Sequence, residues 1–192
     1  MIDSAIGHLT SQLNQHLRRR FALAEDMAVA TNLQEIGGAA VSSASNKLVL
    51  FISGIERDTA AHRARGAGSG EYTSQLRGSE PLFLNLLMVC AATFSGQSYP
   101  EALKFLSDAI AFFQTRPVFD HQNSPELDAR IERLVLNIEN LSTSEMHSLW
   151  SMHGGRYLPS VLYRIRLVCL DNGMISRREP LVHAPDVGLQ RQ

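Results

Sequence analysis

The sequence predicts an α+β fold in a single domain, with a mixed β-sheet and helices packed against it. Two almost wholly apolar runs, at 47–56 and 81–94, are typical of buried strands. Apolar residues recur at helical spacing in 2–17 and 98–113, which indicates two amphipathic helices. The chain has 192 residues, of which 44% are hydrophobic, and this is enough to fill one sizeable core.

The first half of the chain is expected to begin with a helix and continue with strands. Basic residues at 18–20 end the first helix, where positive charge interacts favourably with the negative end of the helix dipole. A short strand is expected at 27–33. Glycine and serine then interrupt the pattern, and 47–56 is predicted to be a central strand that is buried on both faces.

Two capping boxes mark helix starts in the second half of the chain. Ser98 with Glu101 predicts the start of one helix, with Pro100 in its first turn, and Ser142 with Glu145 predicts the start of a shorter helix. In a capping box the two side chains satisfy backbone N–H groups that the first helical turn leaves free.

Two further strands are predicted from alternating apolar and polar residues. The first is a half-exposed strand at 131–139, and the second is at 161–171. In the second, Tyr163 and its alternate neighbours share the core face, while Arg164 and Arg166 share the opposite face.

Two segments lack the pattern of a packed element. Residues 59–80 are rich in glycine and poor in apolar side chains, so we expect an arm or loop that becomes ordered against a partner. Residues 174–192 show no periodicity and are expected to form a loose tail. The predicted domain therefore spans 1–173 and the tail spans 174–192.

Charge and composition narrow the classes of partner. Lysine and arginine number 18 against 19 acidic residues, so a net charge of −1 favours neither nucleic acid nor an anionic membrane. No apolar run reaches the ~18 residues of a membrane span, and we expect a protein made in and soluble in the cytoplasm. Cys90 and Cys169 lie in apolar runs and are expected to be buried free thiols.

No residue pattern points to catalysis, to a cofactor or to a metal. The glycines at 66–70 do not follow a strand as a phosphate-binding loop would, and the seven histidines are dispersed. The densest polar cluster is the turn between Asp120 and Asp128, which contains His121. A small-molecule site or an enzyme active site at this turn is the alternative to a non-enzymatic protein.

Several long strings resemble a known family. They are PLFLNLLMVCAATF, YPEALKFLSDAIAFFQTRPVF, QNSPEL and LSTSEMHSLWSMHGGRYLPSVLYRIRLVCLD. They are similar to the N-terminal domain of the caps of virulence-cassette and antifeeding-prophage particles, which are the terminators of extracellular contractile injection systems. The resemblance covers residues 2 to about 171.

The resemblance implies a phage tail-terminator-like fold and a structural function. The chain would form a homohexameric ring on the end of the inner tube, contact the last ring of sheath protein, and be incorporated into a particle that is either released or anchored. A baseplate or sheath adaptor of the same particle is the alternative. A ring needs adhesive patches, and we expect these on strand edges, on Arg164 and Arg166, and on the arm residues Arg63, Arg65, Tyr72 and Arg77. A solvated outer face is the other interpretation of Arg164 and Arg166.

Overall fold

The computed structural model describes residues 1–35, 37–58, 76–78, 83–169 and 175–178, and for 76–78, 169 and 175–178 it describes the backbone. Most of the predicted 59–80 arm and the end of the predicted tail therefore lie outside the described residues.

A mixed sheet of six strands forms the centre of the molecule, in the order β1-β2-β4-β7-β6-β5. The strand bounds in that order are β1 Ala28–Ala30, β2 Leu48–Arg57, β4 Phe83–Ala92, β7 Ser160–Cys169, β6 Ile131–Glu139 and β5 Val118–Asp120. Only β1 and β2 are parallel, and every other pair is antiparallel. Separately, β3 (Leu76–Gly78) pairs with β8 (Ile175–Arg178).

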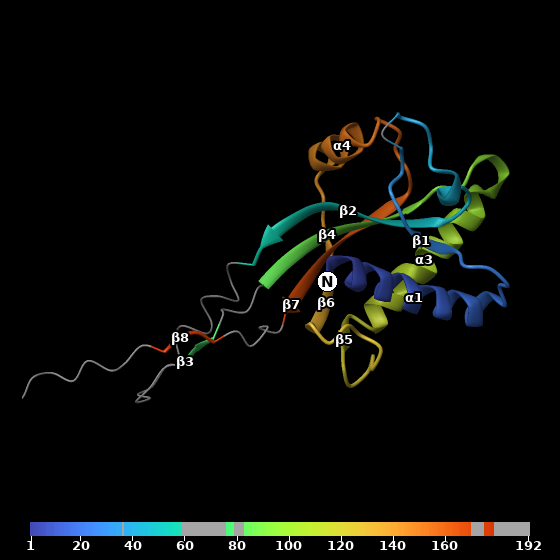
Figure 1. Cartoon of the computed structure of the whole chain (residues 1–192). Helices are drawn as coiled ribbons and strands as arrows, with labels where there is room; N and C mark the ends of the chain where they lie inside the picture. The colour runs from blue at the N-terminus through green and yellow to red at the C-terminus, as the bar shows by residue number, and fades with distance from the viewer. Residues whose placement is uncertain (36, 59–75, 79–82, 170–174, 179–192) are drawn as a thin grey trace, which may run out of the picture.

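Two long helices cover one face of the main sheet. Figure 1 shows α1 (Ile2–Phe21) and α3 (Tyr99–Thr115) on one side of the strands, and the short α4 (Thr143–Met152) on the other. The apolar stripes of α1 and α3 pack against alternate residues of the central strands, such as Met88 and Ile165, to form the larger core cluster. The predicted α+β fold is confirmed.

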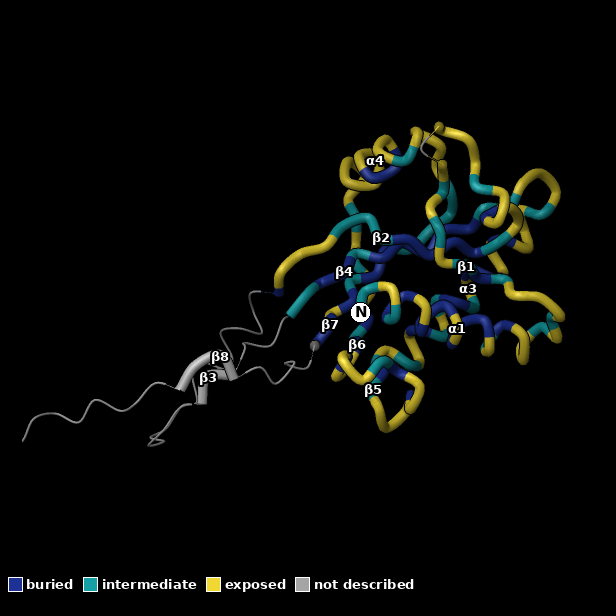
Figure 2. Tube along the Cα trace, viewed as in Figure 1, coloured by how far each residue is buried: buried dark blue, intermediate teal, exposed yellow. Residues whose placement is uncertain are grey.

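The opposite face of the sheet is covered only in part. Leu149 and Trp150 of α4 pack against Phe51, Val89 and Leu162 in a second, smaller core cluster. Figure 2 shows β2 changing along its length from buried to exposed as it leaves this cover. Beyond α4, Glu56 and Arg57 are exposed, whereas Asp58 and Asn85 are buried.

The prediction that β2 is buried on both faces is correct only for its first half. Leu48–Phe51 are buried, whereas Glu56 and Arg57 are exposed. The edge strand β1 pairs with β2 only as far as Leu50, so the rest of β2 has no neighbour on that side among the described residues. The short strand β5 was not predicted, because its three residues lie beside a turn-rich segment.

One of the two predicted capping boxes forms. The backbone N–H of Ser142 donates to Glu145 Oε2 at 2.8 Å, and the N–H of Glu145 donates to Ser142 Oγ at 3.3 Å. The box predicted for Ser98 is wrong, since its side chain makes no capping hydrogen bond. Ser98 ends a 3-10 turn, Gly96–Ser98, with φ −84° and ψ 8°, and so lacks the extended backbone of a capping residue.

Buried polar and thiol groups add detail to the core. Asn14 of α1 forms two hydrogen bonds of 2.8 Å with the backbone of Ala28, one to its N–H and one to its C=O. These bonds satisfy the backbone N–H and C=O of Ala28 on the side of β1 that faces away from β2. Cys90 is a fully buried free thiol, and burial raises its pKa to about 12.

Candidate assembly surface

Arg164 and Arg166 lie on the face of β7 that points away from α1 and α3. Their alternate neighbours Ile165 and Leu167 are fully buried in the larger core, so the period of the strand places both arginines on the other face. The arginine side chains are 31% and 48% exposed, because α4 does not extend over this part of the sheet.

Both arginines are bound by carboxylates of this same chain. Arg164 Nε donates to Glu139 Oε2 at 2.8 Å, and its Nη1 donates to Glu56 Oε2 at 2.7 Å. Arg166 Nε lies 2.7 Å from Asp58 Oδ2. The hydrogen bond from Arg164 holds the pKa of Glu139 below its usual range.

Two of these ion pairs bridge across β4. Glu56 and Asp58 belong to β2 and the residue after it, whereas the arginines belong to β7, and β4 lies between β2 and β7. Neighbouring strands are about 4.8 Å apart, so each arginine reaches over roughly 10 Å of sheet. Only a long side chain can make such a bridge.

Asn85 of β4 lies in the same cross-strand row as Glu56 and Arg166. It is 9% exposed, and its Oδ1 has no hydrogen-bond partner among the described residues. Burying a polar atom without a hydrogen-bond partner is energetically unfavourable. We call this set the charged face: Glu56, Asp58, Asn85, Glu139, Arg164 and Arg166.

A second exposed feature is the turn of residues 152–157 after α4, which we call the glycine turn. Gly154 and Gly155 have φ of 84° and 72°, a region that glycine enters without strain. Met152 and Tyr157 are 72% and 59% exposed. Arg156 is also exposed and has no ion pair within the described ranges.

A cavity of about 480 Å³ adjoins the glycine turn. Its walls come from the segment before β2, from the end of β4 and from the turn itself, and it is lined by Leu33, Gln34, Ala40, Val41, Ala44, Ser45, Thr93, Phe94, Ser95, His153, Arg156, Tyr157 and Leu158. The lining carries no carboxylate. Burial lowers the pKa of His153 and favours its neutral form, so the charge of the lining comes from Arg156.

The structure does not test the other predicted interface residues. Arg63, Arg65 and Tyr72 lie outside the described residues, and Arg77 is described only as a backbone position in β3, opposite Arg177 of β8.

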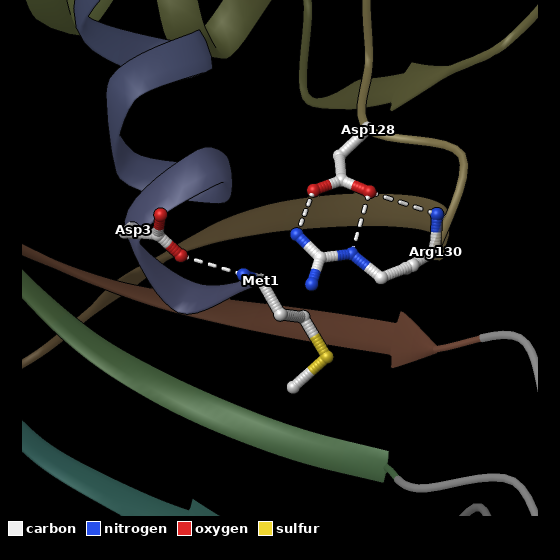
Figure 3. A network of polar contacts seen from close by, with 4 residues as sticks. All are labelled: Met1, Asp3, Asp128 and Arg130. Atoms are coloured by element: carbon white, nitrogen blue, oxygen red, sulfur yellow. Dashed lines mark hydrogen bonds and ion pairs between the residues drawn. The ribbon is translucent and has the colours of Figure 1, made fainter. Parts of the chain in front are cut away.

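The polar turn between Asp120 and Asp128 is held together by its own side chains. Asp120 Oδ1 accepts from the N–H groups of Gln122 and Asn123, at 3.0 and 3.1 Å. Figure 3 shows the carboxylate of Asp128 bound to Arg130, whose Nε and Nη2 donate to it at 3.0 and 2.5 Å. The bonds from Arg130 hold the pKa of Asp128 well below its usual range. Glu126 Oε1 accepts from Gln12 Nε2 of α1 at 2.5 Å, so the carboxylates of this turn make structural contacts within the turn and with α1.

Sequence reasoning did not identify Glu56, Asp58, Asn85 and Glu139 as members of the site. The period-two spacing of Glu56 and Asp58 was visible, but their pairing with arginines more than a hundred residues away depends on which strands are neighbours.

Within the described ranges, no three His, Cys, Asp or Glu side chains lie together as metal ligands. No helix in this part of the chain has both the length and the apolar character needed to cross a membrane.

Comparison with known proteins identifies relatives of the whole domain. The model of the Pvc16 N-terminal domain family matches residues 6–184. A search of curated proteins finds no match. Among solved structures, the fold is similar to the sheath/tube terminator of PVC, an extracellular contractile injection system, in the extended state. The TM-score is 0.60 and the sequence identity is 14%. It is also similar to the tube-terminating cap of the anti-feeding prophage, with a TM-score of 0.51 and 12% identity.

The two solved relatives are longer than this chain. The first match covers 100% of this chain and 64% of the terminator, and the second covers 93% of this chain and 59% of the cap.

Proposed function

We propose that this chain, which belongs to the Pvc16 N-terminal domain family, caps the inner tube of a phage-tail-like contractile injection particle. It acts as a structural subunit without enzymatic activity. The observation that carries this proposal is the match of the entire chain to a sheath/tube terminator at a TM-score of 0.60.

The proposed cap is a homohexameric ring that binds the last ring of the tube and the last ring of sheath protein. A ring forms when one patch of a subunit meets a different patch of the next and the rotation closes, and six subunits would match a six-fold tube. The subunit is made in the cytoplasm and then joins the particle.

Labelling of the particle tests this function. The particle's gene cluster is expressed with and without this chain, and tube lengths are measured by negative-stain microscopy. We expect uniform tubes only with the chain, and a gold label on the chain at the end opposite the baseplate. Uniform, closed tubes without the chain would overturn the proposal, and a label at the baseplate would favour an adaptor.

The charged face is the proposed contact with a neighbouring subunit or with the tube. Arg164 and Arg166 act there by holding three carboxylates in place. Reversing both arginine charges would gather five carboxylates on one face and destabilise the subunit itself. Replacement of both arginines by glutamine is therefore the sharper test.

In that test we expect Arg164→Gln with Arg166→Gln to abolish capping while the subunit stays folded by circular dichroism. The matched control is Arg19→Gln, an exposed arginine of α1, which covers the opposite face of the sheet. Normal capping by the double variant would show that the charged face is not part of the interface.

A further inference from the structure

The cavity beside the glycine turn has the size of a binding pocket. Its volume is about 480 Å³, and pockets that bind ligands measure roughly 300–1,000 Å³. Three walls bound it: the loop 33–41, the segment 44–45 with the residues just beyond β4, and the glycine turn. Contacts of the described residues hold each of these walls in place.

The glycine turn is anchored to the sheet by aromatic contacts. Trp150, which is 4% exposed, meets the Tyr157 ring edge to face, with the ring centroids 5.9 Å apart. His153 packs in the same way against Phe51 of β2, at 4.7 Å between centroids. The turn therefore has a fixed position relative to β2 and to α4.

The other two walls are held by a hydrogen bond and by close packing. The hydroxyl of Thr93, just beyond β4, is hydrogen-bonded to the backbone C=O of Ala44. Gln34 lies so close to Gly154 that a Cβ added at Gly154 would collide with Gln34 Nε2. The walls are thus joined to one another, and the cavity is formed before a partner binds. A preformed site loses little conformational entropy on binding.

The lining combines apolar side chains with one unpaired cation. Val41, Phe94 and Leu158 are only partly buried and pack against the two core clusters. Arg156 is exposed and has no ion pair in the described ranges. Burial lowers the pKa of His153 and favours its neutral form, and no carboxylate of the described residues lines the cavity. The lining therefore offers Arg156 no anion of its own.

One kind of occupant satisfies both parts of this lining. A guanidinium presents parallel N–H donors that match the two oxygens of a carboxylate. The apolar walls suit an apolar side chain beside that carboxylate, because burial of apolar surface is favourable. A peptide in which an aspartate or a glutamate neighbours an apolar residue has this chemistry. A basic segment or a purely apolar one would leave Arg156 unpaired.

We propose that the cavity receives such an acidic segment of another protein of the particle, with its carboxylate on the Arg156 guanidinium and its apolar side chain against the apolar walls. This inference rests on the proposed function and specifies the chemistry of one partner contact. Met152 and Tyr157, which are 72% and 59% exposed, lie on the same turn and surround the contact. Tyrosine, methionine and arginine are enriched in protein interfaces.

Photo-crosslinking in assembled particles identifies the bound segment. Benzoyl-phenylalanine replaces Tyr157 in one variant and, as the matched control, the exposed Tyr99 of α3 in another. Particles are purified and irradiated, and the cross-linked peptides are identified by mass spectrometry. We expect position 157 to cross-link to a segment of another particle protein in which an aspartate or a glutamate lies next to an apolar residue. Position 99 should not cross-link to that segment.

Charge reversal tests the role of Arg156. The subunit is titrated onto particles that were assembled without it, and the bound fraction is measured by sedimentation. We expect Arg156→Glu to weaken binding by about tenfold or more, because a charge-assisted hydrogen bond is replaced by repulsion. Arg19→Glu, at an exposed position of α1, is the matched control and should bind as wild type does. Replacement of the cross-linked carboxylate by lysine should restore the binding of Arg156→Glu.

The outcomes separate this inference from the proposed function. The inference would be overturned, even with capping intact, by the absence of cross-links from position 157 or by cross-links to a second copy of this chain. Cross-links to a segment without a carboxylate, or wild-type binding by Arg156→Glu, would overturn it as well. A gold label at the baseplate would instead overturn capping, and position 157 would still report which segment occupies the cavity.

Discussion

Asn14 holds the edge strand β1 against α1, and its replacement by alanine should be costly. Asn14 is 7% exposed, and its side chain makes both of its hydrogen bonds to Ala28, which is 2% exposed. The change removes two hydrogen bonds worth about 0.5–1.5 kcal/mol each and leaves a buried N–H and C=O unpaired. We expect a loss of about 2–4 kcal/mol.

Urea unfolding followed by circular dichroism measures this loss, and each kcal/mol should lower the melting temperature by roughly 2–4 °C for a chain of this size. Hydrogen exchange supplies the local readout, because the Ala28 amide should lose its protection. Gln15→Ala, at an exposed position of the same helix, is the control and should change stability by less than about 0.5 kcal/mol. A loss below about 1 kcal/mol for Asn14→Ala, with Ala28 still protected, would refute the role of Asn14 as an edge anchor.

Three further predictions test other parts of the structure. Arg164 lowers the pKa of Glu139, so this pair stabilises the fold at neutral pH and loses its effect as pH falls through the folded-state pKa. Glu139→Gln should therefore flatten the acid side of a curve of unfolding free energy against pH. An unchanged acid slope would contradict the pairing. Cys90 should resist iodoacetamide at pH 8 in the native state and react after unfolding, as peptide mass spectrometry would show, whereas rapid native labelling would contradict its burial. Gly154→Ala should destabilise the fold by about 1–2 kcal/mol in urea unfolding, because alanine is strained at the positive φ of this position. Gly7→Ala, within α1 and with open space for a Cβ, should stabilise it by about 0.5–1 kcal/mol. Equal effects of the two changes would refute backbone strain at residue 154.

The elements that the sequence predicted well are those whose signal is local. The stripe of α1 and the alternation of β7 each depend on residues that are close in the chain, and both elements form where expected. The capping box of Ser142 also forms, because an extended residue precedes α4. The same motif fails at Ser98, where a 3-10 turn runs directly into α3 and changes the backbone of the capping position.

The candidate site was predictable only in part, because ion pairs depend on strand order. The alternation of 161–171 placed Arg164 and Arg166 on one face, and that placement is correct. Their carboxylate partners could not be found, since the order β2-β4-β7-β6 is decided by packing of the whole domain. The part of this face that α4 leaves uncovered could not be predicted either, because it depends on how far α4 extends over the sheet.

The incomplete cover of the sheet also explains why its exposed half is charged. An apolar surface at the end of β2, where the strand edge is also unpaired, would favour aggregation of free subunits. Arg164 and Arg166 instead bridge β4 with carboxylates on both sides, so the isolated subunit presents polar groups that already satisfy one another. Arg164 binds two carboxylates, so the bond to Glu139 still holds it when the exposed side chain of Glu56 moves away. This end of the sheet therefore carries paired charges in place of an exposed apolar surface.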